Sequence, residues 1–250
     1  MTDVARNKAD AALDELRVFE ARNSADGLFL RYCRGRAKNF LVRQSATVIG
    51  SIALAVFYQP LLGLIAALTA LAGEAVDSMT AHRIWQRYNG GDVPAFARWL
   101  AAGTAAFQAL TIAACIVIGW ALVPYQDSRL FATAFLIGTA MNAGVVRPFF
   151  RLGADLRLGI YALTLIGLVI HDTILRPVPV LSSPGNGFFL IGAAMIAFIT
   201  VTFIVHLSRT HGVRTRFEHD LLRGKHQLAL SRAAARESER RSRMLALVAE

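Results

Sequence analysis

Two carboxylates stand three residues apart in an otherwise apolar stretch, at Glu74 and Asp77. Residues at this spacing share one face of a helix. A carboxylate at the centre of a membrane span costs roughly 2.5–3.5 kcal/mol, so it usually faces the interior of a bundle or a cavity. Glu74 is therefore a candidate ligand or proton site. The alternative for both residues is solvation at the membrane surface with a basic partner such as Arg83, and we favour it for Asp77.

Four further polar side chains interrupt apolar stretches and complete the set of candidate ligand-binding residues. Gln108 and Asn142 lie within apolar runs, where they would bind a ligand or, as is commoner, form hydrogen bonds between helices. His171 and Asp172 stand together near the end of another run. This pair would sense pH or bind a polar headgroup, or it would simply form the hydrated end of a helix.

The residue types that carry catalysis or bind metals occur without the spacing that either chemistry requires. The sequence has no phosphate-binding glycine loop, no HExxH motif, no Ser/His/Asp arrangement and no CxxC pair. The two cysteines, Cys33 and Cys115, lie far apart and predict neither a disulfide framework nor a metal site. We expect no catalytic residue, no metal and no cofactor in this sequence, and whether the protein is an enzyme stays open.

Long apolar runs must position these side chains, and they predict a membrane protein. Hydrophobic residues make up 55% of the chain and charged residues only 18%, against about 25% charged in soluble domains. A bilayer core of roughly 30 Å needs about 20 apolar residues in a helix. Contiguous apolar runs cross lipid only as helices. Six runs are candidate spans, at Leu41–Tyr58, Leu61–Val76, Trp99–Val123, Leu130–Val146, Leu158–Leu175 and Phe188–Leu207. The second run is short unless it extends through Glu74 and Asp77 to Thr80.

The placement of arginine predicts how these runs are oriented. The links between runs two and three and between runs four and five carry three arginines each, and the other links at most one. Short loops rich in Lys and Arg face the cytoplasm. The expected fold is an all-α integral membrane protein with six transmembrane helices in three hairpins and both termini cytoplasmic, in a bacterial inner membrane. Glycines are expected to permit close helix contact, at Gly63, Gly103, Gly138 and Gly167.

The first domain, residues 1–40, is expected to lie in the cytoplasm and at the membrane surface. Residues 3–22 lack Gly and Pro and predict a soluble helix, which the pair Asp26–Gly27 ends. The stretch that follows mixes apolar and basic side chains, as interfacial segments do. A solvated linker is the alternative. The side chains expected to contact lipid headgroups are Arg31, Arg34, Arg36 and Lys38.

The last domain, residues 208–250, follows the six-helix domain of residues 41–207 and is polar and basic. It predicts one long helix that continues from the last span. A heptad seam with large apolar residues at its two ends runs along this helix. Its positions are Leu221, Leu228, Ala235 and Ser242, alternating with Phe217, Gly224, Ser231, Ser238 and Leu245. We expect a parallel homodimer through residues 213–250, with a solvated tail as the alternative.

The end of this helix, Ser242-Arg243-Met244-Leu245-Ala246-Leu247-Val248-Ala249-Glu250, resembles the start of the dimerisation helix of membrane sensor histidine kinases. In that family the helix runs into Phe-Leu-Ala-x-Met/Val-Ser-His-Glu. The apolar positions are matched by Met244, Leu245, Ala246 and Val248. Ala249 takes the small position, and Glu250 stands where the family has its phosphoacceptor histidine. The resemblance implies that kinase activity would reside in a further C-terminal domain, which we expect because no helix stop signal precedes Glu250.

Together these features predict a membrane sensor module that relays a signal through the last span to a cytoplasmic output domain. Because the outer links are too short for a binding domain, the expected signal is an apolar or amphiphilic small molecule. A small multi-span transporter or channel is the alternative, although no Gly/Pro interruption marks a broken helix. A membrane-embedded lipid enzyme ranks last because it lacks a motif. The net charge of +10 is attributed to basic residues that flank the membrane spans on the cytoplasmic side. No nucleic-acid partner is expected.

Overall fold

The computed structural model describes residues 3–38, 40–89, 91–122, 127–175 and 184–248. Of the residues in these ranges 94% are helical, and none of them forms a strand. The chain forms two compact units, residues 28–209 and, from its two ends, residues 1–27 with 210–250. The helices are α1 (Asp3–Asn23), α2 (Ala25–Lys38), α3 (Phe40–Phe57), α4 (Pro60–Tyr88), α5 (Ala95–Val117), the π-helical turn η1 (Ile118–Leu122), α6 (Asp127–Val146), α7 (Arg151–Leu175) and α8 (Pro184–Val248).

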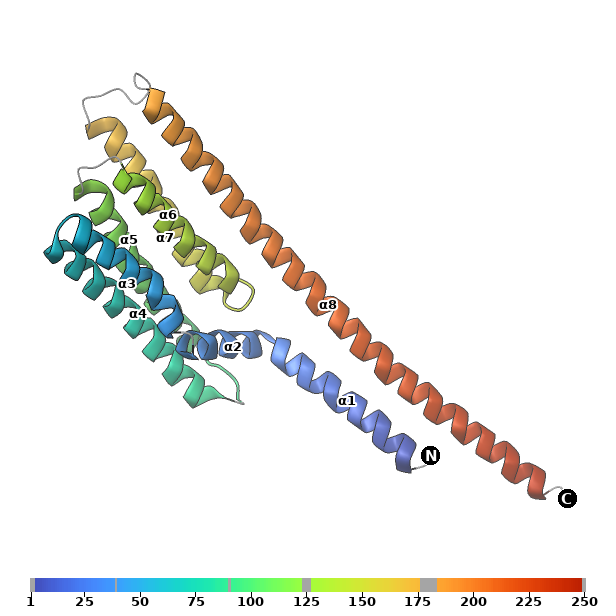
Figure 1. Cartoon of the computed structure of the whole chain (residues 1–250). Helices are drawn as coiled ribbons and strands as arrows, with labels where there is room; N and C mark the ends of the chain where they lie inside the picture. Colours follow the sequence, from blue (N-terminus) through green and yellow to red (C-terminus); the bar gives the residue numbers. More distant parts are fainter. Residues whose placement is uncertain (1–2, 39, 90, 123–126, 176–183, 249–250) are drawn as a thin grey trace. The chain divides into compact units, whose positions relative to one another are not determined.

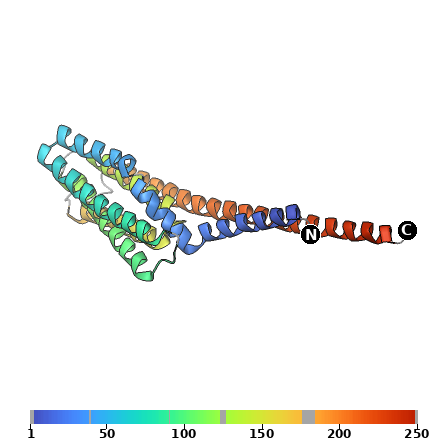
Figure 2. The ribbon, with the colours of Figure 1, turned by 90° about the horizontal axis from the view of Figure 1, so that it is seen from below.

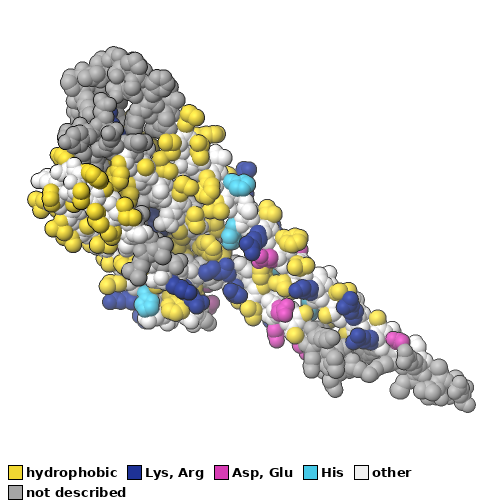
Figure 3. All heavy atoms as spheres, viewed as in Figure 1, with side chains coloured by type: hydrophobic (Ala, Val, Ile, Leu, Met, Phe, Trp, Pro, Cys, Tyr) yellow, Lys and Arg dark blue, Asp and Glu magenta, His cyan; other side chains and the backbone are white. Residues whose placement is uncertain are grey.

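Four of these helices are long and apolar enough to cross a membrane, namely α4, α5 with part of η1, α7 and α8. Hydrophobic side chains cover much of the bundle's outer face, and Lys and Arg gather toward one end of it (Figure 3). This confirms the coarse prediction of an all-helical chain with the apolar helices of a membrane protein. The remaining two predicted runs are also helical and form shorter apolar segments, Thr47–Phe57 in α3 and Phe131–Val146 in α6.

The helices α3 to α7 pack as a bundle within the unit of residues 28–209 (Figure 1). α4 packs between α3 and α5, and α7 packs on α5 and α6. The packing of α4 on α5 rests on small side chains, since Ala70, Ala105 and Ala109 are almost fully buried. Gly73 lies against Thr111 of α5 so closely that a Cβ would overlap it. Small residues of this kind let helix backbones approach in lipid, where van der Waals packing drives association.

The four glycines expected to permit close helix contact do not behave alike. A Cβ at Gly63 would stand 2.5 Å from the Cβ of Ala55 on α3, so this prediction is confirmed. It is wrong for the other three, because no atom of the residues that the structure describes lies within 4 Å of a Cβ built at Gly103, Gly138 or Gly167. These glycines lie on faces that point away from neighbouring helices.

α2 is a short amphipathic helix that lies at the end of the bundle where α4 ends (Figures 1 and 2). Its buried residues are Phe29, Tyr32, Cys33 and Arg36, spaced i, i+3, i+4 and i+7. This spacing is that of one helical face. The apolar members pack into a core with residues of α4, the α4–α5 link and α5, together with Phe150. α2 is therefore part of the protein core on this face.

Within the unit formed by the two chain ends, α1 lies against the later part of α8. The ring of Phe19 lies 6.1 Å from that of His219, and Glu20 Oε1 is 3.2 Å from His219 Nε2. The predicted helix over residues 3–22 is confirmed. Its break falls at Ser24 rather than at Asp26–Gly27, because the Ser24 hydroxyl accepts a hydrogen bond from the Gly27 amide and so caps α2.

The later part of α8 presents the predicted heptad seam, from Phe217 to Ser242, to the outside of this unit. Phe217 is 69% exposed, and Leu221 and Leu228 are about half exposed. The partly buried positions of this part of α8 form a different stripe, which includes His219, Leu222, His226, Ala229 and Ala233. The two stripes share the helical periodicity but face different ways.

Candidate functional site

Asp77 lies at the centre of a buried charge cluster that joins four helices. It stands on α4 and is 1% exposed. Arg36 of α2 donates to Asp77 Oδ2 from Nε at 2.7 Å and also from Nη2. Arg157 of α7 donates to the same oxygen from Nη2 at 2.7 Å. The hydroxyl of Thr104 on α5 donates to Oδ1 at 3.2 Å.

Glu74 extends this cluster by one turn of α4. Its Oε1 lies 3.0 Å from Nη2 of Arg36 and accepts from the hydroxyl of Ser78 at 3.4 Å. Arg157 also donates to the hydroxyl oxygen of Tyr32 at 3.2 Å. The charge cluster therefore comprises two arginines, two carboxylates and three hydroxyls, and its formal charges cancel.

The electrostatics of α2 fit this arrangement. Burial is the largest single influence and lowers the pKa of Arg36, but the charge of Asp77, with Tyr32, Glu74 and the hydrogen bond to Asp77, together outweigh burial and raise the pKa, so the guanidinium stays charged. Burial also raises the pKa of the Tyr32 hydroxyl, which stays protonated. Because both carboxylates of the charge cluster are engaged with arginine, neither is set up as a general base. The arrangement ties α2, α5 and α7 to α4.

No group of three or more His, Cys, Asp or Glu side chains that could hold a metal ion occurs among the residues that the structure describes. Two cysteines are free, with Cys33 buried in α2 and Cys115 partly buried in α5. Burial, and then the charge of Asp77, raises the pKa of Cys33 to about 12. Cys33 is thus an inert thiol.

The partners of the two α4 carboxylates differ from the expected ones. The prediction that Asp77 is solvated at the membrane surface is wrong, because its side chain is buried and paired with Arg36 and Arg157. The suggested partner Arg83 is exposed on α4. The burial of each arginine, although not its partner, is detectable in the sequence, since Arg36 shares its helical face with Phe29, Tyr32 and Cys33. Arg157 likewise shares a face of α7 with two buried residues, Ala154 and Tyr161.

The four residues of α2 that are predicted to contact lipid differ in their exposure. The prediction is wrong for Arg36, which is 5% exposed and bonded to protein. Arg31, Arg34 and Lys38 are exposed on the other faces of the helix. The guanidinium carbon of Arg34 lies 5.8 Å from the centre of the Trp85 ring. Lipid contact by these three residues stays a prediction.

The five candidate ligand-binding residues do not form one site. Glu74 is in the charge cluster, Gln108 is buried in α5, and Asn142 is exposed on α6. His171 and Asp172 lie near the far end of α7 from Arg157, with 3.5 Å between His171 Nδ1 and Asp172 Oδ1. Asp172 also forms an ion pair of 3.2 Å with Arg129 of α6. Ligand binding by any of the five stays a prediction.

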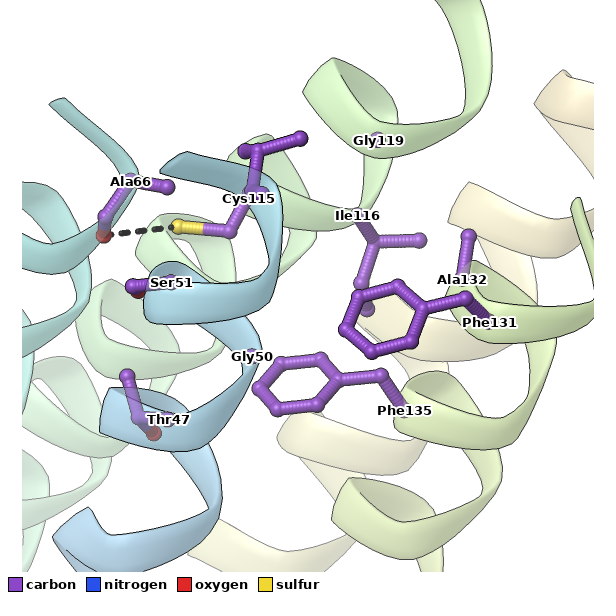
Figure 4. Close-up of a pocket in the computed structure, with 11 residues that line it drawn as sticks. Thr47, Gly50, Ser51, Ala66, Cys115, Ile116, Gly119, Phe131, Ala132 and Phe135 are labelled. Carbon is purple, nitrogen blue, oxygen red and sulfur yellow. Dashed lines mark hydrogen bonds between the residues drawn. The ribbon is translucent and has the colours of Figure 1, made fainter. Parts of the chain in front are cut away.

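One small cavity lies among α3, α4, α5 with η1, and α6 (Figure 4). The rings of Phe131 and Phe135 reach from α6 toward Gly50 of α3, and Cys115 Sγ donates to the carbonyl of Ala66 at 3.2 Å. Its volume is about 40 Å³. A cavity of this size holds a water molecule or two and is too small for an organic ligand.

A larger pocket of about 390 Å³, which we call the α8 pocket, lies between α6 and α7 on one side and α8 on the other. Its walls are largely apolar, and Arg147 and Asp155 stand at one end of it, where α6 passes into α7. Its volume is within the range of small-molecule sites. α8 contributes Ala197, Thr200, Val201, Ile204 and Val205 to it. Sequence reasoning missed this pocket because its lining residues are those of ordinary membrane helices.

α8 approaches α6 directly beside the α8 pocket. Ile204 of α8 is 7% exposed and lies where a Cβ at Gly144 of α6 would overlap it. This contact makes α8 one wall of the pocket.

Comparison of the chain with models of protein families, with curated proteins and with solved structures gives no match.

Proposed function

We propose that this chain is the membrane sensor module of a signal-transduction protein of the two-component sensor kinase type, with six spans in a bacterial inner membrane and both termini in the cytoplasm. A small apolar or amphiphilic molecule would bind among the helices. Its signal would pass along α8 to a cytoplasmic output domain. The short resemblance of Ser242 to Glu250 to the kinase dimerisation helix supports this class of output.

The observation that carries the proposal is the position of the α8 pocket. α8 forms one wall of this pocket and is helical from Pro184 to Val248. A ligand that enters the pocket must contact both the α6–α7 pair and α8. Such a ligand shifts the equilibrium between two positions of α8 by the difference in its affinity for them. The charge cluster, in contrast, fastens α2 to α4, α5 and α7 and supplies a fixed frame.

The output would be a change in how two copies of α8 pack. The exposed seam with Phe217, Leu221 and Leu228 repeats with heptad spacing, so the same face of a second copy complements it. Two copies in one membrane share an orientation, which makes the pair parallel. Gly224 and Ser231 are small seam residues. A seam poor in large side chains holds two helix registers at similar free energy, as a signalling helix requires.

Pulsed electron–electron double resonance tests the proposal without a known ligand. A spin label at Leu221→Cys, with Cys33 and Cys115 replaced by alanine, reports the distance between two copies in nanodiscs. We expect a short inter-copy distance. Ala140→Trp, which fills the α8 pocket, should shift the distance distribution. The matched control is Leu163→Trp, which adds the same ring to a side chain 70% exposed on α7, and it should leave the distance unchanged.

Two results would overturn the proposal. An absent inter-copy signal would remove the dimer that the relay needs. Equal distance distributions for Ala140→Trp and the protein without this substitution would show that filling the pocket does not affect the C-terminal helix. Solute flux through proteoliposomes that is abolished by Glu74→Gln would instead favour the transporter or channel.

A further inference from the structure

We infer that the α8 pocket binds a single-chain anionic amphiphile, such as a medium-chain carboxylic acid, with its headgroup at Arg147 and its chain between α6, α7 and α8. This inference deepens the proposed function and rests on it for its physiological meaning. It follows from the charges at one end of the pocket, from the shape of the pocket and from the surrounding lipid.

The charges at the end of the pocket that Arg147 and Asp155 line favour an anion. Arg147 Nε lies 2.7 Å from Asp155 Oδ1, and Arg151 Nε lies 3.4 Å from Asp155 Oδ2. Two guanidinium groups therefore share one carboxylate, which leaves a net positive charge. Arg147 and Asp155 line the pocket, and Arg147 is only 31% exposed. A ligand carboxylate here gains a charge-assisted hydrogen bond and balances the second arginine.

The rest of the pocket suits one alkyl chain. Along α7 the lining residues run from Asp155 through Leu158, Tyr161 and Ala162 to Leu165. At 1.5 Å per residue this path is about 15 Å long. The hydroxyls of its two threonines are already satisfied, since Thr133 donates to a carbonyl of its own helix at 2.7 Å and Thr200 does so at 2.8 Å. The interior therefore offers apolar contact along an elongated path.

The occupant we assign is a free amphiphile, and not a bilayer phospholipid. A volume of about 390 Å³ lies at the lower end of the range of small-molecule pockets, which fits one chain better than two. An amphiphile that partitions into the bilayer also reaches the pocket sideways, between helices, without needing an outer binding domain.

Photolabelling tests the assignment directly. The probe is dodecanoic acid with a diazirine near its chain end, added to the full chain in phosphatidylcholine nanodiscs. We expect mass spectrometry to locate the adducts on pocket residues such as Leu136, Leu165 and Val201. Unlabelled dodecanoate should compete. Dodecanol should compete at least about ten-fold more weakly, because it lacks the charge-assisted hydrogen bond.

Variants separate the headgroup contact from general lipid contact. Arg147→Gln should lower labelling by the dodecanoate probe about ten-fold. The affinity of dodecanol, measured by competition, should stay unchanged. The matched control, Arg87→Gln at the exposed end of α4, should label as the parent does. Equal competition by dodecanol, adducts spread evenly over lipid-facing helix surfaces, or full protection by phosphatidylglycerol nanodiscs would each overturn the assignment. The last result would identify a phospholipid as the occupant.

Failure of this inference is distinguishable from failure of the proposed function. If dodecanoate labels the pocket but neither dodecanoate nor Ala140→Trp alters the distance between Leu221→Cys labels, the ligand assignment stands and the relay falls. If Ala140→Trp alters that distance but dodecanoate does not bind, the relay stands and the ligand class is overturned.

Discussion

At the scale of single residues, the charge cluster is stable because the attraction between its positive and negative side chains offsets the cost of burying them. Asp77 accepts hydrogen bonds from two guanidinium groups and a hydroxyl. Removing two charges from water is costly, and their attraction offsets this cost only when the geometry is good and the remaining donors are satisfied. Loss of one partner therefore costs far more than the pair itself contributes.

Asp77→Asn is expected to destabilise the protein strongly. It leaves the buried guanidinium groups of Arg36 and Arg157 with one carboxylate between them. Breaking a buried pair in this way costs about 3–5 kcal/mol. Thermal unfolding in detergent, followed by intrinsic fluorescence, should show a large drop in midpoint temperature. Asp92→Asn, at an exposed position in the α4–α5 link, is the control and should unfold like the parent. A parent-like midpoint for Asp77→Asn would contradict the buried pairing.

Cys33 is expected to resist thiol reagents despite its basic neighbours. Its side chain is fully buried, and its pKa is raised to about 12. Since the thiolate is the reactive form, almost none is present at pH 7, and reactivity should rise only as the pH approaches 12. In a Cys115→Ala background, maleimide at pH 7 should leave the native protein unmodified and label it fully in SDS. The control Arg34→Cys, on the exposed face of α2, should label in the native state. Rapid native labelling of Cys33 would argue against this packing of α2.

At the scale of helices, the face that a residue occupies decides its role. The sequence predicts that the apolar runs and the N-terminal segment are helical, and the structure confirms it. The sequence predicts Arg36 at the lipid surface and assigns Arg157 to the arginine-rich link between the fourth and fifth runs, because each stands in a basic cluster. Their spacing to Tyr32 and to Tyr161 puts each on a buried face. Which helix opposes that face depends on tertiary packing, so the pairing with Asp77 could not be predicted from one helix alone.

Glycine to alanine substitutions should separate glycines at helix contacts from glycines on open faces. Gly63→Ala places a methyl group 2.5 Å from the Cβ of Ala55, and such overpacking typically costs about 1–3 kcal/mol. Gly103→Ala meets nothing within 4 Å and improves helix propensity. Thermal unfolding should therefore show a lower midpoint for the first variant and an equal or higher one for the second. The reverse order would contradict the packing of α3 on α4.

At the scale of the whole molecule, the number of spans depends on α3 and α6. Four helices reach the length and hydropathy of a span, while the apolar parts of α3 and α6 are shorter. α3 has 18 residues and α6 has 20, so each is about 27–30 Å long at 1.5 Å per residue. That length matches a hydrocarbon core of roughly 30 Å. Helix length thus permits both to cross, and arginine placement favours it.

Single cysteines decide between six spans and four. Positions Lys38, Asp92 and Asp220 are exposed, and each is replaced by cysteine in turn in a Cys33→Ala, Cys115→Ala background. If all six runs cross, all three cysteines lie on one side of the membrane. If α3 and α6 do not cross, Lys38→Cys and Asp220→Cys lie on the side opposite to Asp92→Cys. A membrane-impermeant maleimide applied to oriented vesicles, with Gln59→Cys as the opposite-side control, should label all three from the cytoplasmic face. Labelling of Asp92→Cys alone from its side would establish four spans and would reverse the orientation of the C-terminal helix relative to the α4–α5 link.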